Sequence, residues 1–190
     1  MNNVALLIGG NQGDRRWLIQ QATELIRQRI GSVVLSSAIH ETAPWGTFGE
    51  QIPQNFLNQA LLVETSLTAH EVLEEALVIE AVLGRVRRDT PQPLRDSSPI
   101  GEQQEERCKI GEVAEGRRGT INFPRVYSSR PMDIDLIFFN DEVIDTPDLQ
   151  IPHPRMHLRR FVLEPLAEIM PDYRHPLLGK TVKELLEDIN

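Results

Sequence analysis

The order of hydrophobic patterns along the chain constrains its fold more than any other sequence feature. Short apolar or alternating runs predict four strands, at residues 4–9, 32–41, 56–65 and 129–139. Helical spacing of apolar side chains follows the first run, as far as Gly31, and the third, from Thr68 to about Leu83. The order strand, helix, strand, strand, helix, strand is that of a ferredoxin-like α+β sandwich (βαββαβ), in which helices cover one face of an antiparallel sheet.

Local signals predict the helix ends and the C-terminal elements. Thr68 and Glu71 have the spacing of a capping box, and Gly84 is a suitable stop for the helix that they begin. Beyond the fourth strand we expect a hairpin at 138–144, a proline-punctuated loop at 145–156 and helices near 159–169 and 181–188. A chain of 190 residues with this pattern is expected to form a single domain over residues 1–190.

Charge and cysteine content limit the possible partners and compartment. The chain has 20 Lys and Arg against 28 Asp and Glu, a net charge of −8, which argues against a general nucleic-acid or anionic-membrane surface. Cys108 is the single cysteine, so no internal disulfide is possible, and this usage fits a reducing compartment. The apolar N-terminal run is too short for a signal peptide or a membrane span. We therefore expect a cytoplasmic monomer that binds neither nucleic acid nor membranes.

Residues 89–128 do not follow the regular pattern. They contain several prolines and glycines and mixed charge without a sustained period, so a packed core element is not expected there. Loops of this length are uncommon without a function. The segment is either a disordered surface insertion or a mobile cover over a site, since it leads directly to Asp133.

Asp133 and Asp135 stand one residue apart at the start of an apolar run. Alternation places both side chains on one face, roughly 6.6 Å apart at about 3.3 Å per residue, with Ile137 and Phe139 continuing that face. At an effective dielectric constant of about 20 the two charges repel by roughly 2.5 kcal/mol. Either water solvates both carboxylates at a frayed strand end, or a cation makes them a site.

Basic residues flank the irregular segment, at Arg85, Arg87, Arg88 and Arg130. Guanidinium groups suit phosphate oxygens, although surface pairing with Glu or Asp is the alternative. Two carboxylates that bind Mg²⁺, together with arginines, are typical of enzymes that act on polyphosphates. His153 has a proline on either side, which forbids the helix that a metal pair with His157 would need. We therefore favour His153 as a hydrogen-bond donor to a phosphate oxygen.

Six segments of the chain resemble one known family in their order and spacing. They are ALLIGGNQGDR, ETAPWG, FLNQALLVETSL, IEAVLGRVRR, SRPMDIDLIFFNDEVIDTPDL and IPHPRMHLRRFVLEPLAEIMPD. Together they are similar to the 6-hydroxymethyl-7,8-dihydropterin pyrophosphokinases of folate biosynthesis. The resemblance implies a ferredoxin-like fold, transfer of the terminal diphosphate of MgATP to the pterin hydroxymethyl group with release of AMP, and a catalytic loop at 89–128.

The resemblance also implies roles for individual residues. Asp133 and Asp135 would hold two Mg²⁺ ions along the triphosphate, and both would be catalytic together with Arg87 and Arg130. The ATP contacts would come from Arg85, Arg87, Arg88, Arg130, His153 and Arg159. The pterin would lie between the rings of Phe56 and Phe161, which without the family are as compatible with a core role. Asn58 and backbone groups around Thr42 and Trp45 would match the polar edge of the pterin.

Two departures from the family and two other classes of protein bear on this assignment. Tyr127-Ser128-Ser129 stands before Arg130 where many relatives have Trp-Gly-Pro, and Asp148 and Gln150 stand where some have Arg and Thr. A nucleotidyltransferase also uses two aspartates on a strand, but its Gly-Ser pair and third carboxylate have no convincing match here. A ferredoxin-like RNA-binding module would need aromatic motifs on its central strands and a basic face, whereas this chain is acidic.

Overall fold

The computed structural model describes residues 1–43, 54–84 and 131–189. The predicted catalytic loop at 89–128 therefore lies outside the described residues. The elements, in chain order, are β1 (Asn2–Gly10), α1 (Arg15–Arg29), β2 (Ser32–Ser36), β3 (His40–Thr42), β4 (Phe56–Thr65), α2 (Ala69–Val82), β5 (Asp133–Phe139), β6 (Ile144–Asp145), β7 (Gln150–Ile151), a short 3-10 helix (Met156–Leu158), α3 (Arg160–Ile169) and α4 (Val182–Asp188). None of the helices in these three ranges combines the length and apolar character of a membrane-spanning segment.

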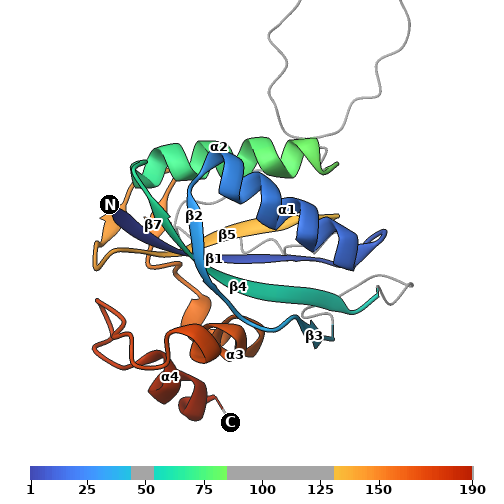
Figure 1. Ribbon diagram of the computed structural model, residues 1–190. Helices are drawn as coiled ribbons and strands as arrows, with labels where there is room; N and C mark the ends of the chain where they lie inside the picture. Colours follow the sequence, from blue (N-terminus) through green and yellow to red (C-terminus); the bar gives the residue numbers. More distant parts are fainter. Residues whose placement is uncertain (44–53, 85–130, 190) are drawn as a thin grey trace, which may run out of the picture. The chain divides into compact units, whose positions relative to one another are not determined.

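The main sheet has the strand order β2–β4–β1–β5, with β3 pairing to the far end of β4 (Figure 1). Every pair in it is antiparallel, and β1 lies between β4 and β5. This is the strand order of the ferredoxin-like sandwich, so the predicted fold class is confirmed. The capping box at Thr68 and Glu71 is confirmed too, because the side chain of each residue accepts a hydrogen bond from the backbone N–H of the other.

Helices cover both faces of the sheet, whereas the sequence predicted cover on one face. Side chains of α1 and α2, among them Ile26 and Ile79, pack on the face that carries Leu6 and Ile8 of β1. The helices α3 and α4 pack on the opposite face, against a second core that includes Leu7 (Figure 1). The C-terminal helices thus form a second layer.

The strand predicted at 32–41 is wrong as a single element, because residues 37–39 separate β2 from β3. At Ser37 the backbone N–H still donates to the Ala60 carbonyl at 2.9 Å, but the Ala60 N–H donates to Ser37 Oγ at 3.0 Å and not to a backbone carbonyl. The chain then leaves β4 and returns at His40, which pairs with Asn58. Sequence alternation alone does not reveal this break, since Ser is common both in strands and at their ends.

The region after the Asp pair differs from the prediction in two respects. Ile137 and Phe139 were both expected on the face of the two aspartates. Ile137 does lie on that face, in the second core, but it is the extra residue of a bulge in β5, so Phe139 faces the first core. The hairpin expected at 138–144 is also wrong, because β6 pairs with β7 and not with β5. Asn140, with a φ of 47°, turns the chain away from the sheet.

Candidate active site

One end of the sheet, on the face covered by α3, brings most of the described candidate residues together. Gly9 of β1 pairs with Asn58 of β4 on one side and with Asp133 of β5 on the other. Neighbouring strands are about 4.8 Å apart, so the Asn58 and Asp133 backbones are about 10 Å apart across Gly9. Residues far apart in sequence thus form one surface, in which the central position has no side chain.

Gly9 is required where it stands, although the sequence analysis did not single it out. A Cβ there would clash with Asn58 Oδ1 and would lie 2.8 Å from the Leu57 carbonyl oxygen. The Asn58 amide therefore occupies the space above Gly9. A glycine inside a strand marks such a close approach, so the pair Gly9-Gly10 was the available signal.

The predicted pterin residues on β3 and β4 are held in place by hydrogen bonds and strand pairing. Asn58 is only 4% exposed, and its Nδ2 donates to Thr42 Oγ1 at 2.8 Å. Thr42 is in register with Phe56. Side chains at alternate positions share a face, so Phe56 and Asn58 point the same way as Ala60, which belongs to the second core.

Phe161 reaches this face from α3. Its ring is partly buried and packs against the second core, while the guanidinium carbon of Arg159 lies 5.6 Å from the ring centroid. Such a distance allows a cation–π interaction. The predicted pterin residues Phe56 and Phe161 thus come from two elements, β4 and α3, that pack on each other.

Asp133 and Asp135 are both partly exposed and alternate with Ile134 and Leu136, which are buried in the first core. Their predicted placement on one face of the strand is confirmed by this alternation. A side chain of α2 holds the edge of β5, because the Ile134 N–H donates to Glu80 Oε1 at 2.8 Å. Glu80 is a buried residue near the end of α2.

His153 follows β7 and is attached to β5, since its backbone N–H donates to the Ile137 carbonyl at 3.0 Å. Burial lowers its pKa to about 4, with the positive charge of Arg159 as the next cause. The ring is therefore neutral at pH 7. Its Nδ1 accepts the Arg155 N–H at 3.3 Å, so Nε2 carries the hydrogen and is able to donate.

A pocket of about 640 Å³ adjoins these residues. Asp135 and His153 line it, together with α2 at Leu73 and the β6–β7 hairpin at Asp148 and Gln150. The two positions that depart from some relatives therefore form part of its wall. His70 Nε2 lies 3.9 Å from Asp148 Oδ2 at this side of the hairpin. Sequence reasoning did not predict Leu73, which reads as an ordinary core position in a helical stripe.

The donor set matches what a magnesium polyphosphate requires. Within residues 1–43, 54–84 and 131–189 no three His, Cys, Asp or Glu side chains cluster as a metal site. Asp133 and Asp135 offer two carboxylates on one face of β5, and Mg²⁺ is usually held by one or two carboxylates plus phosphate oxygens and water. Other predicted site residues lie outside the described ranges, namely Trp45, Arg85, Arg87, Arg88 and Arg130.

An α+β sandwich with two neighbouring carboxylates at the start of an edge strand is typical of one class of protein, the enzymes that act on polyphosphates with a bound metal. A family model described as 7,8-dihydro-6-hydroxymethylpterin-pyrophosphokinase (HPPK) matches residues 5–95 and 102–171. The chain therefore belongs to the 7,8-dihydro-6-hydroxymethylpterin-pyrophosphokinase family.

Several curated relatives have the same name, 2-amino-4-hydroxy-6-hydroxymethyldihydropteridine pyrophosphokinase. The protein of Bacillus subtilis is 36% identical over 171 residues, which cover 89% of this chain and 79% of the relative. That of Aquifex aeolicus is 32% identical over 184 residues, or 97% of this chain and 90% of the relative. That of Methylorubrum extorquens is 31% identical over 191 residues, covering 100% and 95%.

Solved structures support the fold. A structure entitled HPPK-DHPS in complex with substrates matches with a TM-score of 0.64 at 15% identity, over 98% of this chain and 43% of that one. The Plasmodium falciparum HPPK-DHPS with pteroate gives a TM-score of 0.65 at 15% identity, over 98% and 42%. The chain spans less than half the length of these two structures, so the likeness concerns the fold of one part of them.

Proposed function

We propose that the residues at the Gly9 end of the sheet carry out the reaction of the family. That reaction is transfer of the terminal diphosphate of ATP to the hydroxymethyl group of 6-hydroxymethyl-7,8-dihydropterin in folate biosynthesis. One observation carries the assignment. Asp133 is next to the surface formed by Gly9 and Asn58, whereas Asp135 lines the pocket that contains His153. The two carboxylates thus connect a surface suited to a flat polar ring with a pocket suited to a nucleotide.

On the pterin side, each residue offers a specific contact. The Asn58 amide presents both a donor and an acceptor group, as the edge of a pterin does. Phe56 and Phe161 are aromatic rings on the two layers that enclose this surface, and aromatic stacking favours a planar ligand between them. Backbone groups near Thr42, and near Trp45 outside the described residues, complete the proposed set.

On the nucleotide side, Asp133 and Asp135 are proposed to hold two Mg²⁺ ions along the triphosphate of ATP. When bound, Mg²⁺ neutralises charge on phosphate oxygens. His153 donates a hydrogen bond to a phosphate oxygen through Nε2, and Arg159 supplies positive charge. Arg87, Arg130 and Arg159 are predicted to hold the transferred diphosphate, with Arg85 and Arg88 nearby. Attack of the pterin oxygen on the β-phosphorus forms the new P–O bond and breaks the bond to AMP.

Product analysis tests this proposal. With γ-labelled ATP and 6-hydroxymethyl-7,8-dihydropterin, we expect label in a pterin diphosphate and an equal amount of AMP. An ordinary kinase would release ADP, and a nucleotidyltransferase would release diphosphate. ADP as the main product, or AMP release that does not depend on the pterin, would contradict the proposal. We also propose that the enzyme acts as a cytoplasmic monomer. Size-exclusion chromatography of the purified chain tests the oligomeric state.

A further inference from the structure

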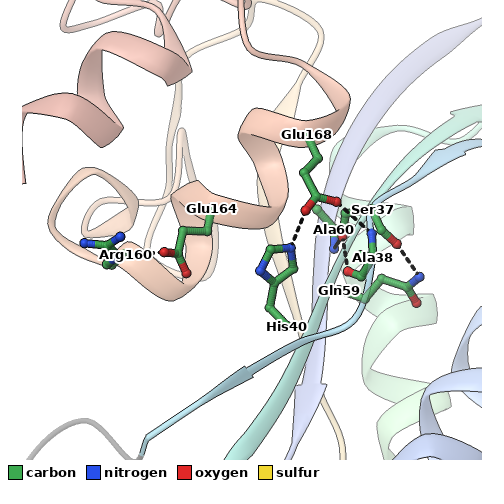
Figure 2. A network of polar contacts seen from close by, with 8 residues as sticks. All are labelled: Ser37, Ala38, His40, Gln59, Ala60, Arg160, Glu164 and Glu168. Carbon is green, nitrogen blue, oxygen red and sulfur yellow. Dashed lines mark hydrogen bonds and ion pairs between the residues drawn. The ribbon is translucent and has the colours of Figure 1, made fainter. Parts of the chain in front are cut away.

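Glu168, near the end of α3, contacts Ala38 in the segment between β2 and β3 and His40, the first residue of β3. Its Oε2 accepts the Ala38 N–H at 2.8 Å, and its Oε1 lies 2.7 Å from His40 Nε2. Figure 2 shows both contacts from one carboxylate. We call Ala38, His40 and Glu168 the α3–β3 clamp.

The clamp occupies the place where the backbone ladder is interrupted. After the backbone bond from the Ser37 N–H to Ala60, the chain leaves β4 and side chains supply the next contacts: Gln59 Nε2 donates to the Ser37 carbonyl at 2.8 Å. Glu168 satisfies the Ala38 N–H at the same break (Figure 2). The position of β3 is therefore set by a side chain of α3 as well as by the strand beside it.

Residue spacing relates the clamp to the proposed pterin surface. His40 and Thr42 are at i and i+2 of β3, so they share one face, about 6.7 Å apart. Phe161 and Glu168 are at i and i+7 of α3, about two turns apart and again on one face, that which packs on the sheet. Thr42 holds Asn58, and Phe161 is the proposed stacking ring. The clamp thus joins the two elements that carry the two sides of the pterin surface.

The α3–β3 clamp is not expected to add much to the free energy of unfolding. The Glu168 and His40 side chains are 41% and 23% exposed, and ion pairs of such exposure contribute little to the free energy of unfolding. A two-point attachment nevertheless fixes geometry, and a binding surface requires its parts to be held within about 0.5 Å.

We propose that Glu168 is a positioning residue for the pterin, acting through β3 and α3 to set the gap between Phe161 and Asn58. This inference rests on the proposed pterin site. Glu168 is not proposed to contact the substrate or to act on ATP, because no residue of α3 lines the pocket proposed for ATP.

The test compares variants of the full chain for pterin affinity, ATP affinity, steady-state kinetics and thermal unfolding. For Glu168→Ala we expect the pterin Kd and KM to rise about tenfold, equivalent to about 1.4 kcal/mol, with the ATP Kd unchanged within twofold. Glu168→Gln should restore pterin affinity to within threefold, because its amide oxygen still accepts the Ala38 N–H. His40→Ala, which leaves Ala38 bound, should give an intermediate rise.

Glu164→Ala is the matched control. Glu164 lies one turn earlier on the same helix and its carboxylate pairs with Arg160, at 2.6 Å (Figure 2), so the pterin Kd should stay within twofold of wild type. Unchanged pterin affinity in Glu168→Ala, or equal losses of pterin and ATP affinity, would overturn the positioning role. If Glu168→Ala does not fold, unchanged pterin affinity in His40→Ala would overturn it instead. Wild-type enzyme that binds no pterin would contradict the proposed function itself.

Discussion

Replacing Gly9 by alanine should perturb the proposed pterin surface through the Asn58 amide. The added Cβ would clash with Asn58 Oδ1 and lie 2.8 Å from the Leu57 carbonyl oxygen. The amide can rotate away, but the carbonyl belongs to β4 and moves only with the strand. Overpacking of this kind costs about 1–3 kcal/mol. Rotation would also break the 2.8 Å hydrogen bond from Asn58 to Thr42, which costs about 1 kcal/mol more.

The effect on binding follows from the displaced amide. If two hydrogen bonds to the pterin of about 1 kcal/mol each are lost, affinity falls about 30-fold. Isothermal titration with 6-hydroxymethyl-7,8-dihydropterin measures this loss, and urea unfolding measures stability. The affinity of Gly9→Ala for ATP should change less than twofold.

Gly31→Ala provides the control for instability. A Cβ on Gly31 would clash with the Glu64 backbone carbonyl, which lies at the other end of β4 from Asn58. We expect Gly31→Ala to lose stability comparably and to keep wild-type pterin affinity. Pterin affinity within twofold of wild type in folded Gly9→Ala would refute the reasoning, because Asn58 would then not need its observed position.

Three further predictions concern other parts of the site. Asp133→Asn and Asp135→Asn should each lower turnover more than 100-fold, about 2.7 kcal/mol, with unchanged far-UV circular dichroism; activity within tenfold of wild type in either variant would exclude the metal assignment. Phe161→Ala should weaken pterin binding about tenfold by loss of stacking and leave the ATP Kd unchanged, and equal effects on both ligands would contradict the stacking role. The pKa of His153, lowered from 6.5 to about 4 in the folded protein, makes the unfolded chain bind its proton first, so the free energy of unfolding should fall by about 2 kcal/mol between pH 7 and pH 5. In urea unfolding, His153→Gln should lack this pH-dependent fall in the free energy of unfolding. Identical pH dependence of the two proteins would contradict the lowered pKa of His153.

Predictions from the sequence succeeded where one local signal determined the structure. The strand at Phe56–Thr65 and the capping box at Thr68 depend on alternation and on a four-residue motif, and both are found as expected. The two aspartates lie on one face because β5 is regular as far as Leu136. These features require no knowledge of distant residues.

Predictions failed where contacts distant in sequence decided the structure. The break between β2 and β3 depends on Ser37 and Glu168 acting on the backbone from the side. The bulge at Ile137 changes the face of Phe139, and a one-residue shift of this kind leaves no mark in the hydrophobic pattern. The pair Gly9-Gly10 was a local signal, but the reason for it, the Asn58 amide on another strand, cannot be read from the sequence.

The lateral hydrogen bonds of β5 have a consequence for aggregation. Within the described sheet β5 pairs with β1 on one side only, and its run LIFF at 136–139 is apolar, without proline, and rich in residues that favour cross-β stacking. Glu80 occupies the Ile134 N–H and the backbone of His153 occupies the Ile137 carbonyl on the open side. These two contacts take up groups that another chain would otherwise use to extend the sheet. Changes at Glu80 are therefore expected to reduce the yield of soluble protein through self-association, in addition to any loss of activity.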